Sequence, residues 1–288
     1  QISGLKESLL ALKDIEGIRM RPSMYIGDNG IQGMHHLLQE VISNSVDEFL
    51  NGYGDTITIN INTKENLAVI ADNGRGIPFG KNKDGKEALI DIATKLHSGG
   101  KFNEQGEEGG YNVSGGLHGI GLTAVNALSS TFCIDSYRDG KRARVVCNKG
   151  IVKSFDVTDT NSDKHGTEIM FSPDPEVLNI SSFDLSRIRK MIQELSFLTS
   201  GLKFTMNDEV FLSKEGLKEL IKDKAIDPIT PPVYITGESE GFKVEASFQF
   251  EKTTGERVFA YTNNIPNKEG GTHITGFKSA FTIAMNKY

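Results

Sequence analysis

The chain has 288 residues, of which 37% are hydrophobic and 24% charged, with a net charge of −6 and a pI near 5.6. This is an ordinary globular composition, and no apolar run approaches the roughly 20 residues that a membrane-spanning helix needs. The acidic balance argues against a dominant electrostatic surface for DNA on this segment. The chain begins at Gln1 without an initiator Met or an apolar signal segment, which predicts a cytoplasmic protein trimmed at its N-terminus.

Hydrophobic periodicity and turn residues predict the elements of the first part of the chain. In order they are an amphipathic segment over 5–19, a turn-rich connector over 21–27, a long helix over 31–50, strands over 56–61 and 67–70, and a helix over 86–97. The second strand delivers Asp72 at its end. The Gly- and Glu-rich stretch 98–116 that follows is long enough to indicate a lid or a binding loop.

A hairpin dominates the middle of the chain. A helix over 119–129 precedes a strand pair over 131–148, which turns at Asp139-Gly140. A two-residue turn there pairs residues whose numbers sum to 279, so Cys133 and Cys147 are out of register by one and face opposite sides. The sequence therefore predicts two buried, reduced thiols rather than a disulfide.

Strands over 151–157 and 166–171 and a helix over 182–196 complete this part of the chain. Strands and helices come in runs without regular alternation, which favours an α+β fold over a doubly wound sheet. The Pro-rich stretch 227–232 indicates a break, after which we expect strands at 242–250 and 257–264 and a helix from Thr272. These patterns predict two domains, 1–226 and 227–288.

The helix over 31–50 carries a polar stripe opposite its apolar face. Glu40, Asn44 and Asp47 make up this stripe, and its ordinary interpretation is a solvated helix surface. His36 lies four residues before Glu40, so its ring can reach that carboxylate. A carboxylate oriented by a His, one turn from an Asn amide, also fits a water-activating base beside a Mg²⁺ ligand. The apolar face holds Leu38, Val41, Ile42, Ser45 and Phe49.

Two glycine-bearing stretches add a possible nucleotide site. The stretch 72–76 reads Asp-Asn-Gly-Arg-Gly, which is typical of a turn but also fits a carboxylate that accepts a hydrogen bond from an adenine amine. The run 114–121 offers main-chain N–H groups before a helix, which suits a polyphosphate. The chain contains no P-loop motif. Residues 119–124 fit a dinucleotide pattern but lack the strand that must precede it.

These three blocks, in this order, resemble the GHKL ATPases, the superfamily of gyrase B, heat-shock chaperones, histidine kinases and mismatch-repair proteins. The flanking segments narrow the resemblance to the ATPase subunit of bacterial type IIA topoisomerases, gyrase B or its topoisomerase IV counterpart. Those segments are Arg21–Gly27, His35-His36, His97–Phe102, Ser114–Gly121, Val125–Ser129, Tyr261–Ile265 and Gly270–His273. The resemblance implies a Bergerat-type α+β sandwich, a mixed sheet with helices on one face, followed by part of a ribosomal-S5-domain-2-like transducer domain.

The resemblance also implies roles for individual residues and the cofactors ATP and Mg²⁺. Glu40 would be the general base, His36 its orienting partner, Asn44 the Mg²⁺ ligand and Asp72 the adenine-reading carboxylate, supported by the Thr167 hydroxyl. The nucleotide-binding residues it implies are Asn44, Asp47, Asp72, Gly76, Ile77, Lys101, Tyr111, Gly116, Leu117, His118, Gly119, Ile120, Gly121 and Thr167. The rim where aminocoumarin inhibitors bind in this family would hold Glu48, Arg75, Pro78 and Arg138.

As a function, the resemblance implies ATP binding and hydrolysis that drive DNA supercoiling or decatenation through an ATP-operated dimer gate. The partners it implies are a second copy of the subunit, a DNA-cleaving subunit of the gyrase A or topoisomerase IV A type, and DNA, with no membrane.

The chain departs from the family pattern at Ser43, where an acidic residue is usual, and at 103–110, where the lid segment is longer. It lacks the later loop lysine that contacts the γ-phosphate and most of the N-terminal arm, so we expect ATP binding with slow hydrolysis and poor dimerisation.

Two other hypotheses come from different classes: another GHKL module, such as a histidine kinase or chaperone domain, and a non-catalytic nucleotide sensor. The strands expected after residue 232 favour the topoisomerase over a histidine kinase or a chaperone. A nucleotide sensor would require that the full-length protein show no DNA-stimulated ATPase activity.

Overall fold

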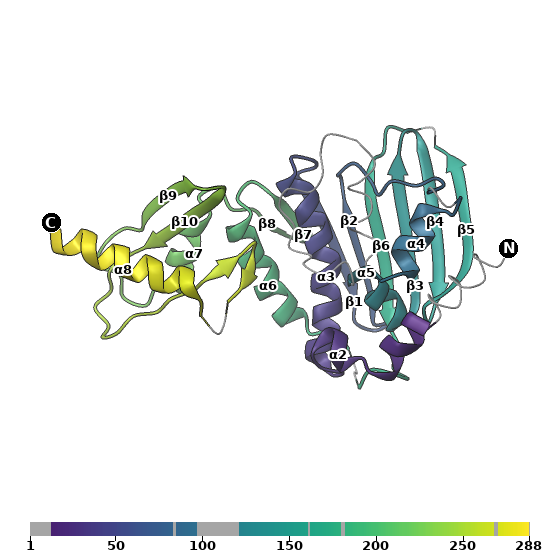
Figure 1. Cartoon of the computed structure of the whole chain (residues 1–288), viewed down its shortest axis with the longest axis horizontal. Helices are drawn as coiled ribbons and strands as arrows, with labels where there is room; N and C mark the ends of the chain where they lie inside the picture. The colour runs from purple at the N-terminus through teal and green to yellow at the C-terminus, as the bar shows by residue number, and fades with distance from the viewer. Residues whose placement is uncertain are drawn as a thin grey trace. The chain divides into compact units, whose positions relative to one another are not determined.

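Eight strands form one mixed sheet, the frame of the first of two units into which the chain divides (Figure 1). The computed structural model describes residues 13–82, 85–96, 121–160, 162–179, 182–267 and 270–287. The two units are Gln1–Gly216 and Leu217–Tyr288. The Pro-rich break at 227–232 therefore lies inside the second unit.

The order of the sheet is β5-β4-β3-β6-β2-β1-β7-β8. Its neighbours pair antiparallel, except that β1 and β7 run parallel. The strands are β1 (Thr56–Asn62), β2 (Leu67–Asp72), β3 (Ser129–Arg138), β4 (Lys141–Asn148), β5 (Ile151–Asp159), β6 (Gly166–Pro173), β7 (Lys203–Met206) and β8 (Glu209–Phe211). The predicted α+β class with a mixed sheet is confirmed.

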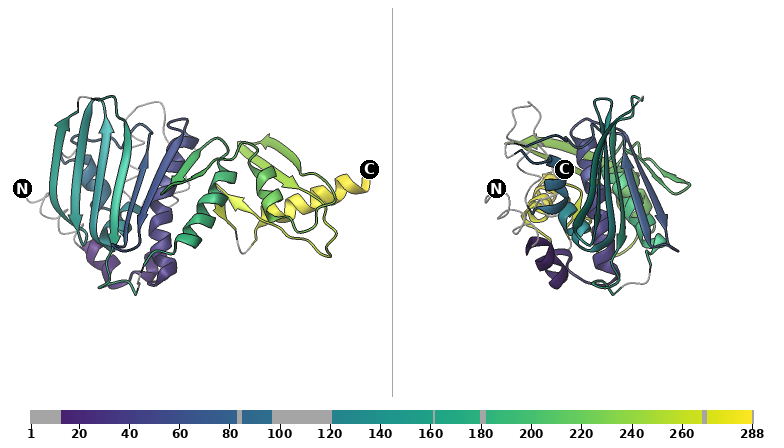
Figure 2. Two further views of the ribbon diagram at one scale, coloured as in Figure 1. Left: turned by 180° about the vertical axis from the view of Figure 1, so that it is seen from behind. Right: turned by 90° about the vertical axis from the view of Figure 1, so that its right-hand side faces the viewer.

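One face of the sheet is apolar because alternate residues of each strand point to it. In β1, Ile57, Ile59 and Ile61 are buried while their neighbours Thr58 and Asn60 point the other way. The helices over this face include α3, α4 and α5, which lie in front of the strands in Figure 1. Seen from behind, the strands from β5 to β2 face the viewer directly (Figure 2).

The helices of the first unit lie where they were predicted, but most of them begin or end at other residues than expected. They are a helical stretch over 13–20, α2 (Ser23–Ile26), α3 (Ile31–Leu50), α4 (Ala88–Thr94), α5 (Gly121–Ala127) and α6 (Leu185–Leu198). The bounds of α3 are those expected, whereas α4 is shorter than 86–97. The N-cap of α6 is Asp184, whose carboxylate accepts from the main-chain N–H groups of Ser186 and Arg187. Among the described residues, no helix combines the length and apolar character needed to cross a lipid bilayer.

The β3–β4 hairpin has the predicted register. Its turn residues Asp139 and Gly140 have φ of 53° and 70°, which a tight two-residue hairpin turn requires. Phe132 pairs with Cys147, and Cys133 pairs with the next residue toward the turn. Both thiols are buried and free, as expected.

The second unit contains two two-stranded sheets, β9-β10 and β11-β12, and the helices α7 and α8. These elements are α7 (Leu217–Lys224), β9 (Val233–Ser239), β10 (Phe242–Phe248), β11 (Tyr261–Thr262), β12 (Ile265–Pro266) and α8 (Thr272–Lys287). Phe248 packs its ring edge-on to Phe281 of α8 at a centroid distance of 4.9 Å. The helix from Thr272 and strand β10 were predicted. A full strand over 257–264 was a wrong prediction, because only Tyr261–Thr262 pairs there.

His35 links α3 to the start of α6. The side chain is buried, and its Nε2 accepts the main-chain N–H of Asp184 at 3.2 Å, which requires an unprotonated Nε2. Burial lowers the pKa of His35 below its ordinary 6.5, and the charge of Arg187 lowers it further, against a smaller opposing effect of Asp184.

We expect His35 to make the protein less stable in mild acid. Because the folded-state pKa is below the unfolded one, the unfolded chain takes up this proton first as the pH falls through about 6.5. The free energy of unfolding should therefore fall below that pH, and less so in His35→Gln, whose amide oxygen can still accept from Asp184. Urea unfolding between about pH 5 and about pH 8 measures both slopes. Parallel profiles for the two proteins would contradict the assignment to His35.

Candidate functional site

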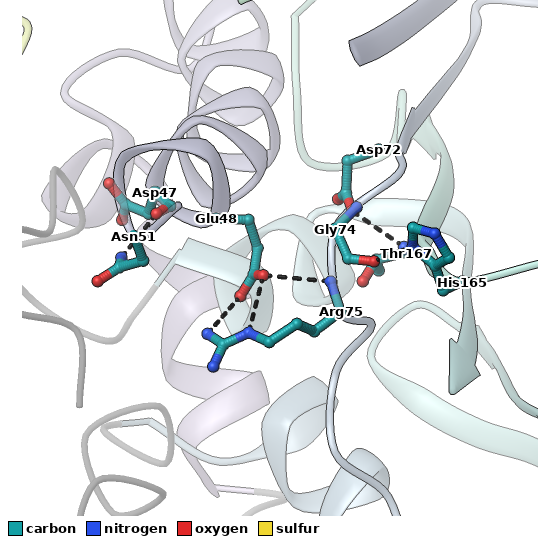
Figure 3. A network of polar contacts seen from close by, with 8 residues as sticks. All are labelled: Asp47, Glu48, Asn51, Asp72, Gly74, Arg75, His165 and Thr167. Carbon is teal, nitrogen blue, oxygen red and sulfur yellow. Dashed lines mark hydrogen bonds and ion pairs between the residues drawn. The ribbon is translucent and has the colours of Figure 1, made fainter. Parts of the chain in front are cut away.

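Contacts bring together α3, the end of β2 and the start of β6 (Figure 3). The first residue of α5 also lies against α3. Among the predicted site residues, those of α3, the 72–78 segment and β6 lie in the described part of the chain, as do Gly121 and Arg138. The others fall outside the described residues: Lys101, Tyr111, Gly116, Leu117, His118, Gly119 and Ile120.

Glu40 and His36 form the pair expected from their spacing. His36 Nε2 lies 3.1 Å from Glu40 Oε1, and His36 Nδ1 lies 3.2 Å from the carbonyl oxygen of Ile26. A carbonyl only accepts, so Nδ1 carries a hydrogen and the ring orientation is set from both sides. The hydrogen bond with Glu40 raises the pKa of His36. Both side chains remain partly exposed, so water can reach the carboxylate.

Gly33 lets the connection between α2 and α3 pack closely against α3. It lies one turn before His36, and a Cβ at this position would sit 1.8 Å from the carbonyl oxygen of Asp28. Real Cβ atoms do not approach main-chain oxygens so closely, so a larger residue would push this connection away, and with it the Ile26 carbonyl that holds the ring of His36.

Asn44 and Asp47 complete the predicted polar stripe, with different environments. Asn44 is exposed, and its Nδ2 donates to the main-chain oxygen of Glu40 at 2.9 Å. Its amide oxygen, the atom that would bind a cation, is not used in that bond. Asp47 is only 5% exposed. The stripe is therefore not solvated along its whole length, and the interpretation as a solvated surface is wrong for Asp47.

The protein oxygens at this site fit Mg²⁺ only if a bound phosphate supplies further ligands. In the part of the chain that the structure describes, no group of three or more His, Cys, Asp or Glu residues could hold a metal ion. Mg²⁺ commonly keeps several waters and binds one or two protein oxygens plus substrate phosphates. The Asn44 amide oxygen suits that role.

Asp72 ends β2 with its carboxylate held by three donors. Oδ1 accepts from the main-chain N–H groups of Gly74, at 2.9 Å, and Thr167, at 3.2 Å (Figure 3). Oδ2 accepts from the Ser45 hydroxyl at 2.9 Å. Thus the bond from Thr167 comes from its main chain rather than from the expected hydroxyl. Burial raises the pKa of Asp72, and these hydrogen bonds work against the rise.

The turn after Asp72 is fixed by close contacts and by side chains from β3 and the start of β6. Gly76 has φ of 80°, and a Cβ there would lie 2.4 Å from the carbonyl oxygen of Tyr137. Ser136 donates its hydroxyl to the carbonyl of Ile77 at 2.7 Å, and His165 Nδ1 donates to the carbonyl of Gly74 at 2.7 Å. Neither Ser136 nor His165 was predicted as a site residue, although His165 lies two residues before the predicted Thr167.

The predicted rim residues Glu48 and Arg75 are paired. Arg75 donates from Nη2 to Glu48 Oε1 at 3.0 Å, from Nε to Oε2 at 3.2 Å, and from its main-chain N–H to Oε2 at 3.3 Å (Figure 3). Its guanidinium also lies over the ring of Tyr53, 3.7 Å from the centroid. Arg138 pairs with the exposed Asp139 at 3.5 Å.

Helix α5 is tied to its neighbours at several points. The Thr123 hydroxyl donates to the carbonyl of Lys95 at 2.9 Å, and Asn126 Nδ2 donates to that of Ala93 at 2.8 Å. Arg19 donates to the carbonyl of Ala127 at 2.8 Å, where a cation also complements the helix dipole. These bonds set where the first residue of α5 lies.

Gly121, that first residue, lies against the catalytic candidate Glu40. A Cβ on Gly121 would be 2.3 Å from Glu40 Oε2. The carboxylate is the flexible end of its side chain, so we expect Gly121→Ala to fold while moving Glu40 away from His36. Turnover of a reaction that uses Glu40 as base should fall about a hundredfold. Gly276→Ala is the matched control, because a Cβ there meets nothing within 4 Å. Measured turnover rates of the two variants test this, and equal rates would contradict the steric argument.

Comparisons with known proteins point to one group. Residues 29–177 match the family described as "Histidine kinase-, DNA gyrase B-, and HSP90-like ATPase", and residues 213–288 match the family "DNA gyrase B". The gyrase B protein of Thermus thermophilus is 41% identical over 293 residues, covering 98% of this chain and 45% of that protein. The topoisomerase IV B protein of Staphylococcus epidermidis is 38% identical over 294 residues, covering 98% and 44%.

A solved structure agrees with these relatives. The 43K ATPase domain of Thermus thermophilus gyrase B, crystallised with an aminocoumarin, superposes with a TM-score of 0.83 at 35% identity, covering 98% of this chain and 74% of that one. The chain spans less than half the length of the curated relatives.

Proposed function

Because the chain belongs to the histidine kinase-, DNA gyrase B- and HSP90-like ATPase family and corresponds to the ATPase region of the gyrase B and topoisomerase IV B proteins, we propose that the site beside α3 binds and hydrolyses ATP. One observation carries the assignment of residues. Glu40, paired with His36, and Ser45, bonded to Asp72, lie on the same helix. A water-activating carboxylate and a base-recognising carboxylate therefore border one site.

Each residue has a task that its geometry supports. Asp72 accepts a hydrogen bond from the adenine amine, beside Gly76 and Ile77. Glu40 takes a proton from the attacking water, while His36 keeps the carboxylate in place and stabilises its charge. The Asn44 amide oxygen, with phosphate oxygens, would hold Mg²⁺, which supplies neutralisation of phosphate charge when bound.

Calorimetric titration with ATP in the presence and absence of Mg²⁺, together with a phosphate-release assay, tests this proposal. We expect one ATP to bind per chain and phosphate to be released slowly. Addition of a chelator should stop the release, because the phosphate charge is then not neutralised. Absence of ATP binding at millimolar nucleotide would overturn the proposal. ATP binding without any release would overturn the catalytic part alone.

For the whole protein, we propose the ATPase part of a type II DNA topoisomerase. ATP binding would close a dimer gate formed with a second copy, and hydrolysis would reset it during DNA strand passage. A DNA-cleaving subunit of the gyrase A or topoisomerase IV A type would complete the enzyme. The "DNA gyrase B" match over 213–288 supports this over a histidine kinase or a chaperone. Assays of DNA supercoiling and of decatenation by the full-length assembly distinguish gyrase from topoisomerase IV. An assembly that showed neither activity would contradict the proposal.

A further inference from the structure

Ser45 carries a buried hydroxyl inside the site. From its sequence position, Ser45 was predicted to lie on the apolar face of α3. It is 6% exposed, and its Oγ donates to Asp72 Oδ2 at 2.9 Å. It lies one residue after Asn44 and five after Glu40, so the helix that carries these two also holds Asp72.

A count of acceptor sites shows what this hydrogen bond does to Asp72. A carboxylate has about four acceptor sites, two on each oxygen. Oδ1 accepts from the N–H groups of Gly74 and Thr167, and Oδ2 accepts from Ser45. Within the described residues, one acceptor site therefore remains, and it lies on Oδ2. A single N–H donor satisfies it.

The Ser45 oxygen adds to this preference for donors. Its hydrogen is committed to Asp72, so the oxygen can only accept further bonds. Two neighbouring oxygens, Asp72 Oδ2 and Ser45 Oγ, thus both lack a hydrogen to offer to a ligand. A purine with an exocyclic amine at position 6 can donate to this pair, whereas a purine with a keto oxygen there brings a third acceptor and leaves buried polar atoms unpaired.

Resting on the proposed ATP site, we propose that Ser45 is a positioning residue that holds one acceptor site of Asp72 toward the purine amine and so makes the site select 6-amino over 6-keto purines. Asp72 makes the contact with the base. Ser45 fixes which of its oxygens makes that contact, and in which direction.

The test compares Ser45→Ala with the unchanged protein, using ATP and inosine triphosphate as probes in calorimetric titrations with Mg²⁺. Without the hydroxyl, the carboxylate loses one of three anchors, so ATP should bind about fivefold to tenfold more weakly. Inosine triphosphate cannot use the amine contact, so its affinity should stay within about twofold. The ATP preference should shrink accordingly, and Ser45→Thr, which keeps a hydroxyl, should restore most of it.

Ser43→Ala provides the matched control, since it makes the same chemical change two residues earlier on α3 and should leave the preference unaltered. An unchanged ATP preference in Ser45→Ala, or an equal loss of affinity for both nucleotides, would overturn the inference. Failure of the unchanged protein to bind ATP would instead overturn the proposed function, so the two failures are distinguishable.

Discussion

Replacement of Asp72 by Asn should weaken ATP binding by about a hundredfold or more while leaving the protein folded. The carboxylate accepts from Ser45, Gly74 and Thr167 through both of its oxygens. An amide of the same shape has one acceptor oxygen and one NH₂ group. In either orientation, at least one of these donors, or the adenine amine, would face N–H instead of a lone pair.

Calorimetry with ATP measures this loss, and circular dichroism verifies the fold. Asp208→Asn is a suitable control because it removes the same charge from an exposed position in the turn between β7 and β8. If Asp72→Asn bound ATP as tightly as the control did, the assignment of Asp72 to the adenine would have to be abandoned.

Replacement of Glu40 by Ala or Gln should stop turnover while ATP still binds. A positioned general base contributes about 10² to 10⁴ in rate, so phosphate release should fall by that factor. Gln has nearly the shape of Glu but cannot take up the proton of a water molecule. The charged partner of His36 is lost in both variants, so the pKa of that ring, raised by Glu40 in the native protein, should fall.

Single-turnover phosphate release, paired with ATP titration, separates the two effects. The titration should give an affinity within a few-fold of the unchanged protein, because Asp72 and its donors are untouched. NMR titration of His36 reports whether the pair is broken. Hydrolysis by Glu40→Gln at the native rate would show that another group activates the water.

Local patterns were sufficient to predict the long elements and the pairs within them. Helix α3 was predicted from its apolar repeat, and the contact of His36 with Glu40 followed from their i, i+4 spacing. The register of the β3–β4 hairpin followed from a two-residue turn. In these cases the partners are close in sequence, so spacing alone fixes the geometry.

Elements stabilised from a distance were missed. Strand β7 has only four residues and pairs in parallel with β1, which is far away in the chain. Its alternation of polar and apolar residues covers only four positions, which is too short to stand out as a strand. The two-residue β11 shows the opposite error, since a β-rich run over 257–264 mostly found no neighbour to pair with.

The same reason explains what was missed in the site. Ser45 was grouped with the apolar residues because its partner Asp72 lies on another element. Gly121 was assigned to phosphate binding from its motif, whereas its contact with Glu40 depends on how α5 lies against α3. At Ser45 and Gly121, the one local indication of a close contact was the small size of the residue.

The two native thiols make this protein convenient for chemical labelling. Cys133 and Cys147 are the only cysteines in the chain, and both are buried. Burial raises the pKa of Cys133 to about 11 and that of Cys147 to about 12. At neutral pH only about one Cys133 in ten thousand is a thiolate, the reactive form. A cysteine introduced at the surface of each unit would therefore react with a maleimide dye first, and energy transfer between the two dyes could follow the units during a catalytic cycle without removing either native cysteine.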